Sequence, residues 1–533
     1  MRRARNIGFG GRFGLRAGMA AQVASPVLRN DSQADRARQG GNVMRIMLSL
    51  LMAALFFSGC SFAPDYHRPE QELPSSWGRD ESKPRPGELS REWWRRFNDE
   101  ALNDLVSRAL AQNRNLEQSL ARVDSARAAL GLARAGLFPQ ISAQGSGERA
   151  RASLDTSASY GLVRELGALE NRVDALDGQG ARSVSAPSRV DSLWSGAVQA
   201  AWELDIWGRY RNAADAAREN LLSAEDAAQA MELSLAGQVC SAYFDMLNYR
   251  EQRDLTERTL KVRESSAALY EKQYAAGAIS ELDILNVRTQ VDSLKDSLAQ
   301  AKTRLEQAEG ALLLLTGATP EEIFSGRAKR GTTLAALPAA PQLPVGLPSE
   351  LLTRRPDIRS AEASLRAVHF QVGEARAAFF PSISLTGSLG TSSTELDRLF
   401  SGAAGTWNFG GGVSLPIFTF GRTVSGVRQA EAAVRAAAAA YELSVQQAFS
   451  DIRSALAAQK GSAESVKSLA DAAARMEKAA ELARARYEAG YSPYLDVLEA
   501  ERTLYASQMQ LAAGRAAQLS AVAQVCVALG GGW

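Results

Sequence analysis

The chain has 533 residues, with 61 lysines and arginines against 59 aspartates and glutamates, so its formal net charge is only +2. A balance this close to neutral gives no reason to expect nucleic acid as a partner, because nucleic acid calls for a concentrated basic face. The two histidines, His67 and His369, are too few and too far apart for a histidine metal site, and the odd set of three cysteines does not suggest a disulfide framework.

The N-terminal segment has the features of a secreted protein. Residues 1–43 are rich in Arg, Gly and Ser without apolar periodicity, so we interpret them as an extension or a misassigned gene start. From Met44, one Arg precedes a mostly apolar run that ends in FSGC, which predicts a signal peptide over residues 44–59. The small residues before Cys60 resemble a bacterial lipobox, after which this cysteine becomes the lipidated N-terminus. The alternative is an ordinary signal peptide with an incidental cysteine. Because Ser61 rather than Asp follows, we expect delivery to the outer membrane.

A helix and a strand are expected after a Pro- and Ser-rich linker. Asn98 or Asp99 can cap the helix, and the Phe138-Pro139 pair stops it. The strand is predicted over about 137–147, because apolar or small residues alternate there with polar ones. Residues 148–191 are polar and of mixed charge, which predicts a long loop. The outward positions of the strand are Ile141, Ala143 and Gly145.

The stretch from Ser192 to Ile279 is the most regular part of the chain. Apolar residues first fall on every second position, which predicts a strand over about 193–206 with one apolar and one polar face. From Gly208 the period changes to about 3.6, and a helix is expected over about 208–273, nearly 100 Å long at ~1.5 Å per residue. A second helix is predicted over about 281–315. The apolar strand positions are Trp194, Val198, Ala200, Trp202, Leu204 and Ile206.

The same pattern is repeated in the second half of the chain. The pairs Gly208/Gly421, Gly277/Gly490 and Asp283/Asp496 all keep one offset of 213 residues. The motif GLFPQIS at 136–142 matches AFFPSIS at 378–384, at an offset of 242 residues, so the first copy has a longer loop between its strands. Gly461 falls within the second long helix, which we interpret as continuous because the 213 offset is unbroken.

This repeat divides the chain into an anchor region and two similar halves. The predicted segments are 1–43 (extension), 44–59 (signal peptide), 60–97 (anchor and linker), 98–318 (first repeat), 319–348 (Pro- and Gly-rich linker) and 349–533 (second repeat). The second repeat is expected to hold strands over about 382–390 and 406–417, and helices over about 421–487 and 493–529.

Four such strands favour a membrane β-barrel made from several chains. Each strand has about ten residues and one continuous apolar face, which is the length that a membrane strand needs. Trp194 and Trp202 lie ~26 Å apart on that face, as in an aromatic band at each interface. Four strands cannot close a barrel, and lipid tolerates no open edges, so closure requires copies of the chain. Two copies would give 8 strands with a filled lumen, and three would give 12 with room for a channel. A soluble sheet packed on helices is the alternative.

Several motifs together are similar to those of the outer-membrane efflux protein family. They are CSFAPDYHRP, WWRRFNDEALNDLVSRALAQN, LPSELLTRRPDIRSAE, the FP-strand pairs, Y-x-A-G…LDVL and the terminal ALGGGW. The family comprises TolC-like channels, and the resemblance is to the NodT-type lipoproteins of resistance–nodulation–division (RND) efflux systems. It covers Cys60 to Trp533.

The resemblance implies a mixed α/β membrane protein that forms a homotrimer. Four strands per chain would build a 12-stranded transmembrane β-barrel, continued by a 12-helix α-barrel in the periplasm, with an equatorial belt from the termini and the linker. The implied function is a passive exit duct for drugs or small toxic compounds, joined by a periplasmic adaptor to an inner-membrane RND pump. The implied location is the cell outer membrane, with lipid on Cys60 and no cofactor or metal.

Two groups of site residues follow from the resemblance. The repeated turn corresponds to the periplasmic tip that contacts the adaptor, with Gly277, Leu282, Asp283, Gly490, Leu495 and Asp496. A purely structural interpretation also fits this turn. Ser280 and Asp283 form a capping box, Ser492 is an N-cap before Pro493, and the two glycines are helix C-caps.

The second group would close the periplasmic end. Glu477 is the best positional match to the family's acidic ring, with Asp471 and Glu481 nearby on helical spacing. Three copies around a narrow axis would attract cations and strain the closed state. The alternative is a solvated helix face, on which Lys478 and Arg484 neighbour these carboxylates.

The chain contains no G-x-S-x-G, no Walker-type glycine loop with lysine, no H-E-x-x-H and no C-x-x-C, so we do not expect an enzyme. Cys240 and Cys526 are interpreted as packing residues rather than reactive thiols. Two alternatives keep the fold and change the cargo: metal-ion efflux and type I secretion. An alternative of another class is a coiled-coil lipoprotein that serves as a non-conducting envelope scaffold. The four alternating strands count against it, because a scaffold needs no lipid-facing band.

Overall fold

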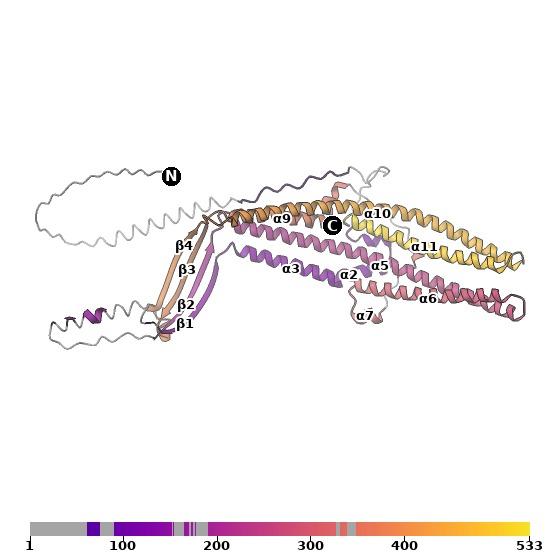
Figure 1. The fold of residues 1–533 in the computed structure, drawn as a ribbon, viewed down its shortest axis with the longest axis horizontal. Helices are drawn as coiled ribbons and strands as arrows, with labels where there is room; N and C mark the ends of the chain where they lie inside the picture. Colours follow the sequence, from indigo (N-terminus) through magenta and orange to yellow (C-terminus); the bar gives the residue numbers. More distant parts are fainter. Residues whose placement is uncertain are drawn as a thin grey trace, which may run out of the picture. The chain divides into compact units, whose positions relative to one another are not determined.

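The computed structural model describes residues 61–74, 90–151, 153, 165–169, 172–173, 176, 190–326, 331–337 and 348–532. They lie in one compact unit, Cys60–Trp533, in which long helices extend from an antiparallel sheet (Figure 1). The predicted extension over 1–43, the signal peptide over 44–59 and the lipid attachment at Cys60 concern residues outside these ranges.

The sheet has four strands in the order β1-β2-β3-β4, and each neighbouring pair is antiparallel. Among the described residues, β1 and β4 each have one partner, so both edges of the sheet are unpaired. The strands are β1 (Gln140–Arg151), β2 (Val190–Glu203), β3 (Ser382–Ser393) and β4 (Gly405–Ser414).

Most predicted strand limits differ from the observed ones by three or four residues: β2 starts and ends three residues earlier than predicted, and β3 ends three residues later. β1 starts later than predicted because Leu137 and Phe138 still close the last turn of the preceding helix. It also runs on to Arg151, opposite Val190, so the loop predicted over 148–191 is shorter. β4 ends at Ser414 rather than near 417, since Pro416 has no N–H to donate to a ladder.

The helices of the first repeat include one break that the sequence pattern did not predict. The helix expected from Asp99 to Phe138 is divided at Asn113, whose backbone is extended, with φ −66° and ψ 127°. Asp99 caps the first piece as predicted, accepting hydrogen bonds from the backbone N–H groups of Ala101 and Leu102. The elements are η1 (Trp93–Phe97), α2 (Glu100–Gln112), α3 (Arg114–Ala135), α5 (Arg209–Ala275), α6 (Glu281–Leu315) and α7 (Pro320–Ser325).

The second repeat has the same plan. Its long helix passes Gly461 without interruption, as the constant offset predicted. The elements are α8 (Leu351–Arg354), α9 (Pro356–Ala377), α10 (Arg422–Glu488) and α11 (Tyr494–Ala528). Short 3-10 turns lie in the linker and the β3–β4 loop: η2 (Leu334–Ala336), η3 (Pro348–Glu350), η4 (Leu396–Arg398) and η5 (Gly402–Ala404).

The helices form one curved layer rather than a globular bundle (Figure 1). Next to the sheet, α3 packs on α5, α5 on α9, and α9 on α10. Farther from the sheet, α6 packs on α5, while α11 packs on both α5 and α10. The layer therefore ends in α3 and α6 on one side and in α10 on the other.

The largest core lies where α2, η1 and the linker meet α5, α6 and α11. Trp93, Phe97, Tyr243 and Phe244 are buried there. Cys240 and Cys526 belong to the same core, and burial raises the pKa of both thiols, that of Cys526 to about 12. Thiols that stay protonated in an apolar core are unreactive, in agreement with the predicted packing role.

By length and composition alone, α11 is the one helix among the described residues that could cross a membrane. Half of its most apolar window is buried within the chain. A buried core helix passes the same test, so this property does not identify a membrane span.

Candidate functional site

The register of the sheet places the apolar side chains of all four strands on one face. Ala143 pairs with Val198, Val198 with Leu389, and Leu389 with Trp407, so these residues form one continuous row. The neighbouring row on the opposite face is Ser142, Gln199, Ser388 and Asn408. Val198, Leu389 and Trp407 are 50%, 68% and 72% exposed, although they are hydrophobic. A face of this kind is suited to lipid, with a polar face turned the other way.

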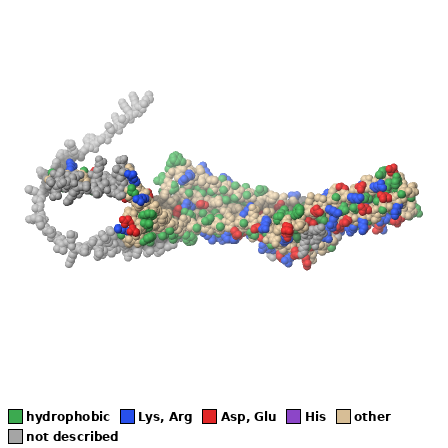
Figure 2. Space-filling model, turned by 90° about the horizontal axis from the view of Figure 1, so that it is seen from below, with side chains coloured by type: hydrophobic (Ala, Val, Ile, Leu, Met, Phe, Trp, Pro, Cys, Tyr) green, Lys and Arg blue, Asp and Glu red, His purple; other side chains and the backbone are tan. Residues whose placement is uncertain are grey.

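The hydrophobic surface is concentrated at the sheet end of the unit. Figure 2 shows hydrophobic side chains gathered there, whereas acidic and basic side chains are interspersed along the helices toward the opposite end. Phe409 and Val413 continue the exposed apolar face, and Phe418 and Phe420 extend it to the junction with the helices. An exposed patch of this size in water would be an aggregation site, which also points to a membrane environment.

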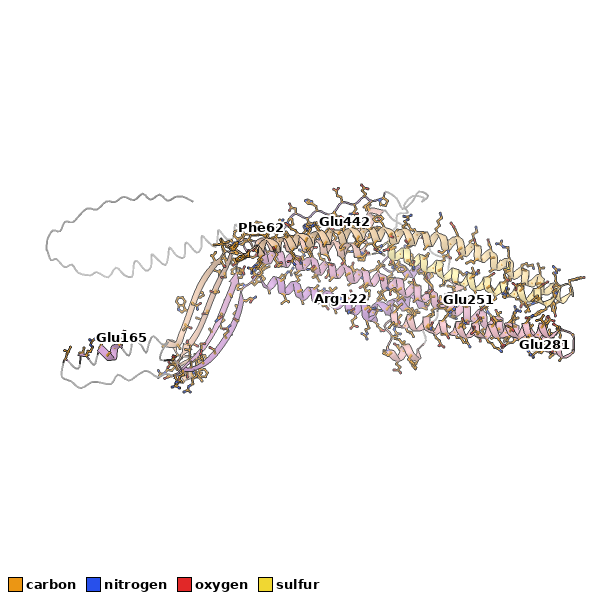
Figure 3. The ribbon with its side chains drawn as sticks, in the orientation of Figure 1. Phe62, Arg122, Glu165, Glu251, Glu281 and Glu442 are labelled. Carbon is orange, nitrogen blue, oxygen red and sulfur yellow. The ribbon has the colours of Figure 1, made fainter. Side chains whose placement is uncertain are left out.

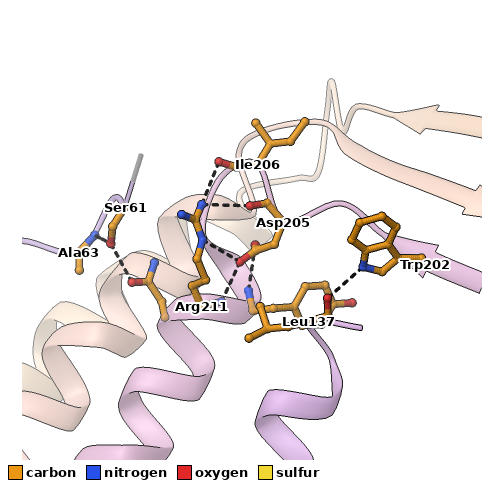
Figure 4. A network of polar contacts seen from close by, with 9 residues as sticks. Ser61, Ala63, Leu137, Trp202, Asp205, Ile206 and Arg211 are labelled. Atoms are coloured by element: carbon orange, nitrogen blue, oxygen red, sulfur yellow. Dashed lines mark hydrogen bonds and ion pairs between the residues drawn. The ribbon is translucent and has the colours of Figure 1, made fainter. Parts of the chain in front are cut away.

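The junction between sheet and helices is held by a polar network (Figure 4). Asp205 accepts hydrogen bonds from the backbone N–H groups of Tyr210 and Arg211, at 3.0 and 2.8 Å. The Arg211 side chain in turn donates to the carbonyl oxygens of Asp205 and Ile206. Gly208 makes this turn possible with a φ of 76°, and Gly421 has the equivalent φ of 81°. The two repeats therefore share the left-handed glycine of this turn, while the Asp205–Arg211 network belongs to the first repeat.

The opposite end of the layer consists of two helical turns, α5–α6 and α10–α11. Gly277 and Gly490 have φ values of 71° and 78° and follow the C-caps of α5 and α10. In each turn the next residue donates a backbone hydrogen bond back into the helix, Ala278 to Gln273 and Tyr491 to Arg486, as in a Schellman motif. The structural part of the prediction for the two glycines is thus confirmed.

The start of α6 matches the predicted capping box, but the start of α11 does not match its predicted cap. The Asp283 side chain accepts hydrogen bonds from the N–H and hydroxyl of Ser280, which lower the pKa of Asp283. In the second repeat, Pro493 itself is the N-cap of α11, and the Ser492 hydroxyl is buried without a hydrogen-bond partner. The predicted Ser492 cap is therefore wrong, because the helix starts one residue later than expected.

The other three predicted tip residues, Leu282, Leu495 and Asp496, also lie in these turns. Leu282 and Leu495 are 67% and 63% exposed, and Tyr491 beside them is 78% exposed. Asp496 is in the first turn of α11, where a carboxylate favours the helix dipole. Figure 3 labels Glu281, the first residue of α6, at this end, and Phe62 at the sheet junction. Both turns meet in a core of Tyr270, Ile284, Val287 and Leu498.

A ladder of polar contacts joins α5 to the α10–α11 hairpin above this core. Thr256 and Tyr505 share a hydrogen bond of 2.8 Å, and Arg263 forms an ion pair of 3.1 Å with Glu501. The Tyr270 hydroxyl donates to that of Tyr487 at 2.7 Å. Burial and this hydrogen bond raise the pKa of Tyr270. The sequence analysis missed this ladder, although its α5 members are spaced by seven residues and so share one helix face.

The predicted aperture residues do not all come together. Glu477 and Glu481 line one cavity of about 290 Å³ between α5, α10 and α11, together with Arg258, Arg263, Arg484 and Glu501. Asp471 is not among its lining residues. Glu481 forms an ion pair of 3.0 Å with Lys478, and both side chains are largely exposed. Within one chain, Glu477 and Glu481 therefore lie beside basic side chains, as the alternative interpretation of a solvated helix face predicted. Their role in an assembled aperture stays a prediction.

Among the described residues, no group of three or more His, Cys, Asp or Glu side chains is arranged to hold a metal ion.

Comparisons with known proteins extend over nearly the whole chain. The family model described as "Outer membrane efflux protein" matches residues 105–318 and 347–531. The solvent efflux pump outer membrane protein SrpC of Pseudomonas putida is 33% identical over 493 residues, covering 91% of this chain and 97% of the relative. The cation efflux system protein CusC of Escherichia coli is 32% identical over 483 residues, covering 90% and 97%.

Solved structures show the same likeness. The crystal structure of the Campylobacter jejuni CmeC outer membrane channel superposes with a TM-score of 0.80 at 26% sequence identity. The match covers 89% of this chain and 95% of that one.

Proposed function

Because the chain belongs to the outer membrane efflux protein family, we propose that three copies of it close one transmembrane duct. The protein is the outer-membrane component of an efflux system, and its TolC-like fold extends from the outer membrane into the periplasm. The homotrimer, the adaptor contact, the lipid anchor and the cargo are parts of the proposal.

The observation that supports the trimer best is the sheet with two unpaired edges and one exposed apolar face. In lipid, every unpaired backbone N–H and C=O costs several kcal/mol, so β1 and β4 must each find a partner strand. A second and third copy provide these partners if β4 of one chain pairs with β1 of the next. Three copies give 12 strands, which leaves a lumen, whereas two copies give 8 strands and a lumen filled by side chains.

The helical layer has matching free sides. It ends in α3 and α6 on one side and in α10 on the other, as the sheet ends in β1 and β4. Leu120 and Leu132 on α3 are 47% and 77% exposed, and Leu443 on α10 is 60% exposed. Contact between α10 of one copy and α3 and α6 of the next would bury these side chains and continue the barrel as a helical tube.

The tip is the proposed contact with a periplasmic adaptor, which joins the duct to an inner-membrane RND pump. Leu282, Leu495 and Tyr491 present apolar surface at the end of the long helices. Gly277, Asp283, Gly490 and Asp496 set the shape of the two turns that carry this surface. Apolar groups exposed on rigid turns are suited to docking against the helical ends of another protein.

We also propose that Cys60 carries lipid and that the channel needs no cofactor. Ser61, the next residue, lies at the sheet–helix junction, where its hydroxyl donates to Asn212 at 2.8 Å. A lipid on the preceding residue would therefore start at the level where the apolar sheet begins. We propose no catalytic activity for the chain, since its relatives are channel components.

For the cargo we infer drugs or other small toxic organic compounds. Among the relatives, SrpC is named for solvent efflux and CusC for cation efflux. With only two histidines and nine methionines in 533 residues, this chain offers few soft ligands along a path for copper or silver ions. Metal-ion efflux and type I secretion keep the same duct and are the alternatives that transport assays would separate.

The test of the duct is the native mass of the purified protein together with its single-channel conductance in a planar bilayer. We expect a trimer with a small, cation-selective conductance that rises when Glu477 and Glu481 are both changed to Ala. A trimer whose conductance does not change in this double variant would support the duct and contradict the assignment of the acidic aperture. A monomer that never conducts would overturn the duct and favour the envelope scaffold.

A further inference from the structure

The segment that follows Cys60 is extended and lies along the helical layer. We call residues 61–74 the strap. It has no regular secondary structure, and it contains three prolines, which favour an extended backbone. Phe62, Ala63 and Pro64 are all half-buried, and beyond them the half-buried Tyr66, Pro69, Gln71 and Leu73 are separated by exposed residues. Such alternation along an extended segment indicates that one side of it is docked.

The N-terminal end of the strap is held by an aromatic stack and a close approach of its backbone to α9. The Phe62 ring stacks on Phe380, with centroids 4.5 Å apart and an interplanar angle of 8°, and Phe380 stacks on Trp207. At Ala63 the strap passes directly over Gly373 of α9. A Cβ at Gly373 would lie 2.7 Å from the backbone nitrogen of Ala63, 2.8 Å from its Cα, and 2.7 Å from Nδ2 of Asn212, the residue that binds the Ser61 hydroxyl. Only glycine leaves room for the strap at this point.

The middle of the strap is held by one buried carboxylate on α9. Glu362 has a side chain that is 5% exposed. Its Oε1 accepts hydrogen bonds from the Tyr66 hydroxyl and from Arg68 Nε, both at 3.0 Å. Its Oε2 accepts from Arg68 Nη2 at 2.8 Å, so the arginine is bound in the bidentate manner. Arg366, one turn along α9, adds an ion pair of 3.2 Å with the same carboxylate.

We propose that α9 carries a docking groove for the strap, in which Glu362 and Gly373 are the positioning residues. This inference rests on the proposed lipid attachment at Cys60. The docked strap fixes the place of Ser61 at the sheet–helix junction, so a lipid on the preceding residue would enter the membrane at that level. The strap thereby holds the N-terminus to the duct without help from the lipid.

The proposal can be tested with two variants that weaken docking by different means. Glu362→Gln removes the charge that Arg68 and Tyr66 bind, while Gly373→Ala puts a methyl group where the strap backbone lies. Chymotrypsin cleaves after aromatic residues, so we would follow cleavage at Phe62 and Tyr66 in the purified full chain, by the mass of the products. We expect both variants to be cleaved at least about tenfold faster than the parent protein, because charged hydrogen bonds hold the segment closed.

Two matched controls separate strap release from general instability. Glu219→Gln removes the carboxylate of α5 that binds Arg366 but has no hydrogen bond to the described strap residues. Gly461→Ala adds a methyl group inside a helix where no other atom lies within 4 Å. Neither control should speed cleavage at Phe62 or Tyr66. Unchanged cleavage in both strap variants, or equal acceleration in all four, would overturn the proposed groove.

Acylation of Cys60 and channel conductance are measured on the same samples. A failure of the proposed lipid attachment or of the proposed duct is then distinguished from a failure of the proposed groove. The mass of the N-terminal peptide shows whether Cys60 is acylated, and planar-bilayer conductance shows whether the channel works. We expect Glu362→Gln and Gly373→Ala to keep both properties. Absence of acyl chains on Cys60 would refute the lipid attachment alone, since the cleavage rates still report on the groove.

Discussion

Asn113 and Arg355 occupy equivalent positions in the two repeats, and each donates a hydrogen bond to the carbonyl end of another helix. Asn113 Nδ2 donates to the carbonyl oxygen of Leu315 at 2.8 Å, and Arg355 Nη1 donates to that of Ala528 at 2.9 Å. Leu315 and Ala528 are the last residues of α6 and α11. Since α3 and α9 begin directly after the two donors, one side chain joins the end of one helix to the start of the next.

This joint predicts unequal effects of alanine at the two positions. Arg355 also binds Asp357 and Asp451, and its side chain is 10% exposed while both carboxylates are more than 40% exposed. Arg355→Ala loses these charged hydrogen bonds and the one to Ala528, and should cost about 2–3 kcal/mol of unfolding free energy. Asn113→Ala removes an N-cap and one further hydrogen bond, which should cost about 1–2 kcal/mol. Amide hydrogen exchange in the last turns of α11 and α6 measures both effects. Equal exchange in the two variants would contradict the role of the charged pair.

The two faces of β2 predict opposite tolerance of charge. Val198 is on the exposed apolar face, and Gln199 beside it is on the polar face. Val198→Lys should destabilise the folded barrel by about 2–4 kcal/mol, because lysine near the middle of a lipid-facing strand is poorly solvated. Gln199→Lys should have little effect. The measurement is the folded fraction in lipid vesicles. A comparable loss of folded protein in both variants would contradict the assignment of the Val198 face to lipid.

The ladder between α5 and α11 predicts a gating effect of one carboxylate and not of its neighbour. Glu501→Gln leaves Arg263, whose side chain is 5% exposed, without its anion, at a cost of about 3 kcal/mol. Glu499→Gln breaks only the exposed pair with Arg502, which solvent screens, so little stability should be lost. We expect Glu501→Gln to loosen the tip and raise single-channel conductance, with Glu499→Gln unchanged. A conductance that is the same in both variants would show that the ladder does not hold the tip closed.

A glycine of the tip and a glycine inside α10 predict opposite signs for the same substitution. Gly277 has a φ of 71° with no neighbouring atom within 4 Å of a built Cβ, so the cost of Gly277→Ala is purely conformational, about 1 kcal/mol. Gly461 is helical, so Gly461→Ala should instead stabilise α10 by about 0.5–1 kcal/mol. Thermal unfolding followed by helical circular dichroism distinguishes the two. Stabilisation by both changes would mean that the turn does not need its left-handed residue.

Docking of the strap should weaken in alkali. Burial, with a smaller contribution from Glu362, raises the pKa of Tyr66 to about 12. In a released strap, Tyr66 would ionise near pH 10. The contribution of the neutral Tyr66 hydroxyl to docking is therefore fully present below about pH 10 and is lost as the pH rises toward about 12.

A spin label on Glu72→Cys reports this change, because Glu72 is exposed and the thiols of Cys240 and Cys526 are buried. The label should become mobile between about pH 10 and about pH 12. Tyr66→Phe removes the ionising hydroxyl and should abolish that step. A step that persists in this variant would assign the transition to other groups.

The sequence predicted the long elements well because their signals are repeated. One constant offset located both long helices, both tip turns and the continuity through Gly461, and alternation located the strands and their apolar face. The bounds of α6 agree with the prediction, since Ser280 and Asp283 form a clear capping box.

The missed features depend on contacts between distant segments. The break at Asn113 has no proline to mark it, whereas Arg355 is followed by Pro356. The two positions are equivalent because they are separated by the 242-residue offset between the repeats, so this offset is the signal that could have predicted the break. Glu362 and Gly373 look like ordinary helix residues until the strap is placed against them. Glu477 and Glu481 could be assigned from the sequence only by resemblance, because an aperture is a property of several chains.

The order of the strands has a consequence for how the protein is made. β2 pairs with β3, so the middle of the sheet joins segments that are separated by α5, α6 and the linker. Contacts between segments so far apart in the chain form slowly, while helical hairpins form from local contacts. The second repeat must therefore leave the secretion machinery before the sheet can assemble. The chain thus crosses the inner membrane before the apolar face of its sheet is complete. Insertion into lipid is thereby delayed until the whole chain has reached the periplasm.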